Sequence, residues 1–245
     1  MGAKARPGTW SAAQRWAYAI GAPYHAQHRY SVHRLPAGRP SEVGERKLGL
    51  ARDWDISGPT DLVQAMNRLG VAGHRHDHRM QVCWYCLMRR PTVASRREQL
   101  RDAGREDSDA LRELWRLNAV QADWKGVRGS RFLAFDAARA VMLARDGLTF
   151  GWLEEEAAWN YMLDVARDVQ RTYSSWREFG QDFLISRGYW QGTGQADVFG
   201  LEPVIHKLLR WPGVWRRLPW RVSDLEIPRE VRAAKDGAPV WWLER

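Results

Sequence analysis

The stretch Leu153–Tyr173, LEEEAAWNYMLDVARDVQRTY, gives the clearest indication of fold in this 245-residue chain. Its three glutamates stand in the first turn of the expected helix, where acidic side chains complement the positive end of the helix dipole. Five larger or apolar residues then recur every three or four positions: Trp159, Met162, Ala166, Val169 and Tyr173. This spacing places them on one face. The stretch therefore predicts a long amphipathic helix that packs against other helices.

Similar helical patterns recur along most of the chain. They cover residues 11–21, 58–70, 76–89, 108–124, 131–147 and 175–190, and a stretch that begins near residue 203. Ser11 with Gln14 and Ser175 with Glu178 have the spacing of a capping box, which marks a helix start. The alternation typical of strands is nearly absent, and no internal repeat is found. The sequence thus predicts a mainly α, single-domain multi-helix bundle.

Three segments depart from this pattern. Residues 22–49 are rich in Pro, Gly, His and Arg and are interpreted as a long excursion, and residues 92–107 as a surface loop or a solvated helix end. The C-terminal tail is broken by prolines, so short strands or 3₁₀ turns are allowed there. Its tryptophans are Trp190, Trp211, Trp215, Trp220, Trp241 and Trp242. We expect a basic N-terminal helix and excursion (residues 1–52) packed on a helical domain (residues 53–245).

Composition limits the class of protein. The chain has a formal charge of +9 and 15 tryptophans, and this aromatic content argues against a disordered chain. Because so large a side chain is seldom wholly buried, some of these rings must lie on surfaces or line grooves. A basic surface attracts anionic partners, including nucleic acid. No recognised nucleic-acid-binding motif accompanies the charge.

The expected compartment of the protein and its expected lack of cofactors rest on sequence features that the chain does not have. Neither a secretory signal nor an apolar run of membrane-spanning length occurs. The two cysteines, three residues apart, cannot form a disulfide framework for a chain of this size. We therefore expect a soluble, cytoplasmic protein with no membrane partner, no metal and no cofactor.

Three stretches carry a resemblance to a known family. They are DWDISGPTDLVQAMNRLGVAGHR (residues 53–75), FDAARAVMLARDGLTFGWLEEEAAW (135–159) and YSSWREFGQDFLISRGYW (173–190). In this order they resemble a bacterial family of unknown function that includes the YbeU- and YbeR-like proteins. The resemblance implies membership but no established activity. One position departs from the family pattern, because Ser186 stands where glycine is expected before Arg187, in what the resemblance implies is a closely packed turn.

The second of these stretches places charged residues among apolar ones. Asp136 and Arg139 are three residues apart, so they share a helix face and can pair. Charges held near a core are costly unless they are paired. Two hypotheses stay open. In one, a buried ion-pair network holds helices together beneath Trp190 or Tyr173. In the other, a cleft for a polar ligand is lined by Asp136, Arg139, Glu156 and Arg187.

Other acidic residues are weaker candidates. Of the three glutamates, Glu156 is expected to face the partner helices. Asp164 and Asp168 are four residues apart and have the spacing to coordinate a divalent cation together with Glu156 or Asp136. A solvated helix face is the simpler interpretation of that pair. No phosphate-binding loop and no nucleophile elbow is present.

The stretch Gly73–Cys86, GHRHDHRMQVCWYC, combines three alternate histidines with both cysteines. On a helix His78 and Cys83 point about 140° apart, so a tetrahedral metal site needs a bend that no turn residue supplies. We therefore interpret both cysteines as small buried hydrophobic residues. His74 belongs to the Gly-His-Arg segment shared with the family, and we ask whether it reaches the Asp136 cluster.

The leading hypothesis is a helical binding module with an ion-paired, Trp-lined groove for a small anionic ligand or a protein partner. Its candidate residues are Asp136, Arg139, Glu156, Arg187, His74 and Trp190. The alternative is an enzyme or antibacterial effector domain that acts on a phosphate-bearing or nucleotide substrate by acid–base or metal-assisted chemistry. A third hypothesis is non-specific binding of nucleic acid through the basic N-terminus and the Arg96–Arg105 segment.

Overall fold

The computed structural model describes residues 10–27, 42–193, 200–222 and 225, and this part of the chain is helical, without a strand. The prediction of a mainly α multi-helix bundle is confirmed. The short strands allowed for the tail do not occur among its described residues. The elements are α1 (Ala12–Ile20), α2 (Ala22–Gln27), α3 (Val43–Trp54), α4 (Pro59–Val71), α5 (Gly73–Leu87), α6 (Arg90–Ala103), α7 (Ser108–Gln121), the 3₁₀ helix η2 (Trp124–Gly129), α8 (Leu133–Thr149), α9 (Glu155–Thr172), α10 (Trp176–Gln191), α11 (Leu201–Leu209) and α12 (Val214–Arg217).

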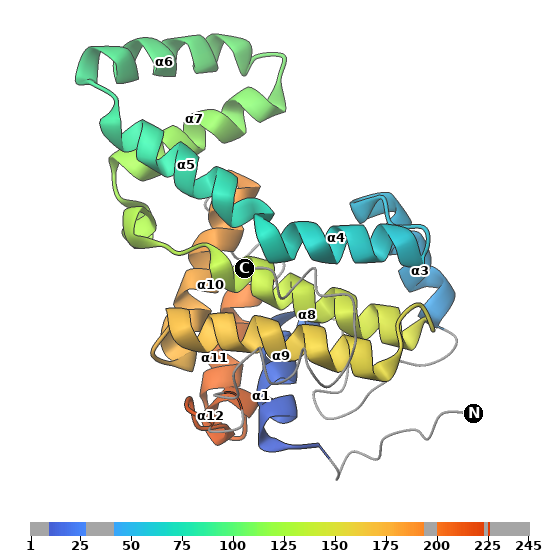
Figure 1. Cartoon of the computed structure of the whole chain (residues 1–245). Helices are drawn as coiled ribbons and strands as arrows, with labels where there is room; N and C mark the ends of the chain where they lie inside the picture. Colours follow the sequence, from blue (N-terminus) through green and yellow to red (C-terminus); the bar gives the residue numbers. More distant parts are fainter. Residues whose placement is uncertain (1–9, 28–41, 194–199, 223–224, 226–245) are drawn as a thin grey trace.

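Helix α8 is the centre of the body, the name we give to every described helix except α5, α6 and α7 (Figure 1). Every residue of α8 from Ala134 to Gly147 is buried, because α1, α4, α9 and α10 all pack on it. A tight turn joins α8 to α9, in which the N–H groups of Trp152 and Leu153 donate to the carbonyl of Gly147 at 2.8 and 3.1 Å. The two helices therefore lie antiparallel, side by side.

The apolar stripe expected on α9 is confirmed. Its members Trp159, Met162, Ala166, Val169 and Tyr173 are all buried. They share one continuous core with residues of α1, α4, α8, α10 and α11. The N-terminal helix is thus built into the same core as the helices that follow it.

Helix starts follow the predicted capping residues more closely than helix ends do. The Ser11 side chain accepts from the N–H of Gln14 at 3.1 Å, and Ser175 accepts from the N–H of Glu178 at 3.1 Å. The glycine expected to end α8, Gly147, lies inside the helix, which continues to Thr149.

Residues 92–107 were interpreted as a surface loop or a solvated helix end, and most of this segment forms helix α6, whose side chains are largely exposed. The loop is therefore wrong, and the solvated helix is the closer of the two interpretations. Helices α5, α6 and α7 make an arm that projects from the body (Figure 1). A second core cluster packs the arm together and against α10, and it includes Val82, Tyr85, Leu117, Ile185 and Tyr189. Val93 and Leu100, seven residues apart, are the buried residues of the otherwise charged α6 and belong to the same cluster.

The excursion predicted at residues 22–49 is also wrong at both ends. Residues 22–27 form α2, in which Ala22, Pro23 and His25 are buried, and α3 begins at Val43. The middle of the segment lies outside the described residues. In the described part of the chain, no helix combines the length and the apolar content needed to cross a membrane.

Candidate functional site

Asp136, in the first turn of α8, is buried and accepts hydrogen bonds from α5 and from its own helix. The backbone N–H groups of His74 and Arg75 donate to its carboxylate at 3.3 and 2.9 Å. The guanidinium of Arg75 lies 3.4 Å from Oδ2, and the guanidinium of Arg139 donates to Oδ1. The predicted Asp136–Arg139 pair is therefore present, and the N-terminus of α5 is held by the same carboxylate.

The corner between α4 and α5 explains the Gly-His-Arg segment. Gly73 has φ of +58°, and a β-carbon there would lie 2.0 Å from Oδ2 of Asp136. Arg75 binds back to the end of α4, donating to the carbonyls of Leu69 and Gly70 at 2.5 and 2.6 Å. Glycine permits the close approach and arginine binds the last carbonyls of the preceding helix. The Gly73–Arg75 segment thus connects α4, α5 and α8 at one corner.

His74 reaches the Asp136 cluster through its backbone, whereas its ring turns outward to aromatic neighbours. The His74 and Trp190 rings are parallel to within 8°, with centroids 6.2 Å apart. The guanidinium of Arg187 lies 4.6 Å from the centre of the Trp190 ring and 5.6 Å from that of Phe135. Arg139 lies 3.9 Å from the centre of Phe135. Five of the six predicted site residues thus gather around one aromatic stack.

Glu156 is not among them. Its side chain is exposed in the first turn of α9, so the expectation that it faces the partner helices is wrong. Because α8 and α9 are antiparallel, Glu156 lies near the end of α8, and from Asp136 to Thr149 that helix rises about 20 Å. The inward-facing glutamate is Glu155, which accepts from the indole N–H of Trp159 at 3.3 Å.

Tyr173, proposed as a cover for Asp136, instead binds a second buried carboxylate, Asp182. The Tyr173 hydroxyl donates to Asp182 at 2.5 Å, and Ser130 Oγ donates to it at 2.7 Å. The backbone N–H groups of Arg131 and Ala134 also donate to this carboxylate, which ties α10 to the start of α8. Sequence reasoning missed Asp182. The sequence does contain an indication of it: Asp182 is an acidic residue on the same helix face as Phe179, Phe183 and Ser186, which are buried.

Ser186 does not lie in a turn. It is buried within α10, which continues to Gln191, and its hydroxyl lies 3.4 Å from Asp182. The turn expected before Arg187 is therefore wrong. Helix α10 ends at Gln191 and is followed by Gly192, where φ is +71°.

The remaining metal hypotheses find little support in the described residues. Asp164 is bound to Arg167 at 3.1 Å, and no group of three His, Cys, Asp or Glu side chains is arranged to hold a metal in that part of the chain. The cysteines were expected to be buried, but Cys83 and Cys86 are both exposed thiols on α5. The prediction failed because the buried face of α5 is occupied by Val82 and Tyr85.

The histidines near the stack are held neutral. Burial lowers the pKa of His78 to about 3, and the neighbouring His74 adds to that effect. Burial also lowers the pKa of His74, with Arg139 acting in the same direction. Burial lowers the pKa of Arg187 as well. Neutral imidazoles and closely spaced guanidiniums make this region a set of packed rings with net positive charge.

A different part of the molecule offers an open hollow, formed between the start of α10 and the segment around α12. Its volume is about 710 Å3. Three tryptophans and three arginines line it, namely Trp176, Trp215, Trp220, Arg177, Arg216 and Arg217, and no carboxylate is among the lining residues that the structure describes. The indoles are fixed by hydrogen bonds to backbone carbonyls, as when Trp176 donates to Leu218 at 3.1 Å. At Asp136, by contrast, the enclosed cavity holds only about 20 Å3.

The arginines proposed to contact nucleic acid are partly used within the arm. Arg96 binds Glu113 at 2.7 Å, and Arg97 donates to Asn118 at 2.7 Å. These contacts attach α6 to α7. Residues 1–9, which belong to the basic N-terminus, lie outside the described part of the chain.

Comparison with known proteins identifies a family. No curated protein and no solved structure matches this chain significantly. A family model described as "Protein of unknown function (DUF1266)" matches residues 49–220. That range covers well over half of the chain and includes the Asp136 cluster, the arm and the hollow. The chain therefore belongs to the DUF1266 family of proteins of unknown function.

Proposed function

We propose that this protein is a binding module for a small anionic ligand, and that the hollow between α10 and α12 receives the ligand's phosphate or carboxylate groups. One observation carries the proposal: three arginines and three tryptophans line a single open hollow, and none of the described residues that line it is acidic. The sequence led us to expect an ion-paired, Trp-lined groove at Asp136 and its neighbours, and we propose a Trp-lined, cationic site at other residues instead.

The chemistry of the lining suits such a ligand. A guanidinium is always charged and presents a planar fork of donors that matches phosphate and carboxylate oxygens. Arg177 lies in the first turn of α10, where the helix dipole adds to the positive potential. The volume of about 710 Å3 lies within the range of small-molecule sites. Trp220 offers an indole face beside these cations.

We propose an architectural role for the residues first singled out at α8. Asp136 accepts from two backbone N–H groups and contacts two guanidiniums, so it has little capacity left for a ligand. Arg139 and Arg187 lie against Phe135. Together with Trp190 and His74 they cover the contact between the Gly73–Arg75 segment and Asp136. The enzyme alternative gains no support from the hollow, because the described residues of its lining include no carboxylate or histidine for acid–base chemistry.

We propose further that the chain is a bacterial, YbeU/YbeR-like member of its family and acts in the cytoplasm. The order of its three motif stretches supports the first point. The free thiols of Cys83 and Cys86 fit a reducing compartment and support the second. We also propose that residues 1–52 are an N-terminal addition packed on the family domain of residues 53–245.

Isothermal titration with inorganic pyrophosphate and with citrate tests the proposal. We expect at least one of the two to bind, and the double variant Arg177→Ala/Arg216→Ala to weaken its binding at least tenfold. The matched control is Arg89→Ala/Arg101→Ala, which removes the same charge from exposed positions on the arm. Binding of neither anion, or equal weakening in both double variants, would contradict a specific site.

A further inference from the structure

We propose that the exposed face of α5 binds the same face of a second copy of this chain, with the two helices antiparallel. This inference concerns the arm and is independent of the proposed ligand site. It rests on four residues that share one face of α5, which we call the α5 stripe: Met80, Cys83, Trp84 and Leu87.

The α5 stripe is apolar and open to solvent. Met80 is 61% exposed, Trp84 53% and Leu87 76%, and Cys83 is an exposed thiol. Spacings of three and four residues place all four side chains together along the helix. The opposite face of α5 carries Val82 and Tyr85, which pack into the core of the arm. Single exposed apolar residues are ordinary, but a contiguous apolar patch marks an interaction site.

The spacing of the α5 stripe fits a copy of itself. In a two-fold symmetric contact, a residue that meets a second residue of the partner copy is itself met by the same residue in return, so the surface must be self-complementary. With the axis between Cys83 and Trp84, two antiparallel copies of α5 bring Met80 level with Leu87 of the second copy. Cys83 then lies level with Trp84. The stripe has this symmetry because its four positions are arranged evenly about that midpoint.

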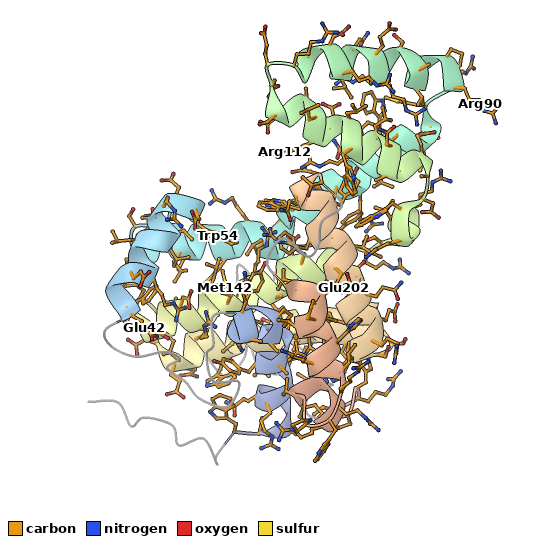
Figure 2. The ribbon with its side chains drawn as sticks, turned by 180° about the vertical axis from the view of Figure 1, so that it is seen from behind. Glu42, Trp54, Arg90, Arg112, Met142 and Glu202 are labelled. Atoms are coloured by element: carbon orange, nitrogen blue, oxygen red, sulfur yellow. The ribbon has the colours of Figure 1, made fainter. Side chains whose placement is uncertain are left out.

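Charge favours the antiparallel direction over the parallel one. Asp77 is exposed near the start of α5, and the exposed Arg89 and Arg90 follow its end. An antiparallel pair places Asp77 at the end of the contact where Arg89 and Arg90 of the second copy follow α5, whereas a parallel pair brings the arginines of the two copies together. Arg90 projects from the outer end of the arm, away from the body (Figure 2). Antiparallel packing also keeps the two bodies at opposite ends of the contact, because each α5 joins its body at the N-terminal end (Figure 1).

Sedimentation velocity of the full chain over a range of concentrations tests the contact. We expect a dimer whose fraction rises with concentration, and at least tenfold weaker self-association in Leu87→Glu. The control is Leu48→Glu on α3, the same change at a side chain that is 73% exposed, and it should leave the dimer intact. A monomer at every concentration, or a Leu87→Glu variant that dimerises as well as the wild type, would overturn the proposal. Circular dichroism shows whether each variant folds.

The direction of the contact is tested separately. Asp77→Arg and Arg90→Asp should each weaken the dimer, and the double variant should restore part of the loss, since opposite charges then face each other again. A short bifunctional maleimide should link two copies through Cys83. Cys83→Ser should abolish that link, and Cys86→Ser, whose thiol lies further from the axis, should retain most of it. Absence of charge rescue together with absence of a Cys83 link would exclude the antiparallel arrangement.

Discussion

The backbone of Gly73 lies directly against the carboxylate of Asp136, so close that a β-carbon on Gly73 would fall 2.0 Å from Oδ2. The two residues belong to helices that meet only at this corner. The contact fixes where α5 leaves the body and hence where the arm points. The same carboxylate also binds Arg75 and Arg139, so one side chain both holds the corner at Gly73 and neutralises two guanidiniums.

The substitution Gly73→Ala should destabilise the fold strongly. The added methyl group collides with Asp136, and φ of +58° is unfavourable for any residue with a β-carbon. We expect a loss of about 2–4 kcal/mol in the free energy of unfolding, from strain and overpacking together. Chemical denaturation measures it. Gly49→Ala is the control, since that glycine lies inside α3 with open space around it, and it should gain about 0.5–1 kcal/mol.

The substitution Asp136→Asn distinguishes the architectural role from a ligand role. Loss of the charge leaves Arg139 buried without its carboxylate, which costs about 3–5 kcal/mol when a buried pair is broken. We therefore expect a large fall in unfolding free energy and unchanged binding of anions by whatever fraction remains folded. Asp109→Asn removes one partner of an exposed pair with Arg112 and should change stability by less than about 1 kcal/mol. An Asp136→Asn variant of normal stability that no longer binds anions would refute the architectural assignment.

Stability should depend on pH through the partly buried histidines, above all His78. The pKa of His78 falls from 6.5 to about 3 on folding, so the unfolded chain binds a proton that the folded chain does not. The stabilisation is fully present above pH 6.5 and is lost as the pH falls toward 3. Its contribution to the slope between pH 6 and 5 is at most about 1.4 kcal/mol per pH unit. His78→Phe keeps a planar ring and should flatten the curve, measured by denaturation at each pH. An unaltered slope would show that His78 is protonated in the folded protein.

Much of the fold could be predicted from the sequence because amphipathic spacing and capping are local properties. The stripe on α9 and the caps at Ser11 and Ser175 depend on residues within one helix, and these predictions were correct. The pairing of Asp136 with Arg139 was also local, since both lie on α8.

Several of the errors concern which face of a helix meets a neighbour. Glu155 turns inward rather than Glu156, and the apolar face of α5 that carries Cys83 points to solvent, because neighbouring helices occupy only one side of each. The role of Asp182 depends on N–H groups fifty residues away, and the hollow combines α10 with α12. No spacing within a single segment encodes such contacts.

The most direct test of the proposed site follows the tryptophan indole N–H signals by nuclear magnetic resonance during a titration with pyrophosphate or citrate. Each indole gives one signal, which Trp→Phe variants assign. We predict that the signals of Trp176 and Trp220 shift and saturate with the ligand, whereas those of Trp115 on the arm and Trp190 beside the Asp136 cluster stay in place. Shifts at Trp190 with none at Trp176 or Trp220 would place the anion at the α8 cluster and contradict the assignment of the hollow.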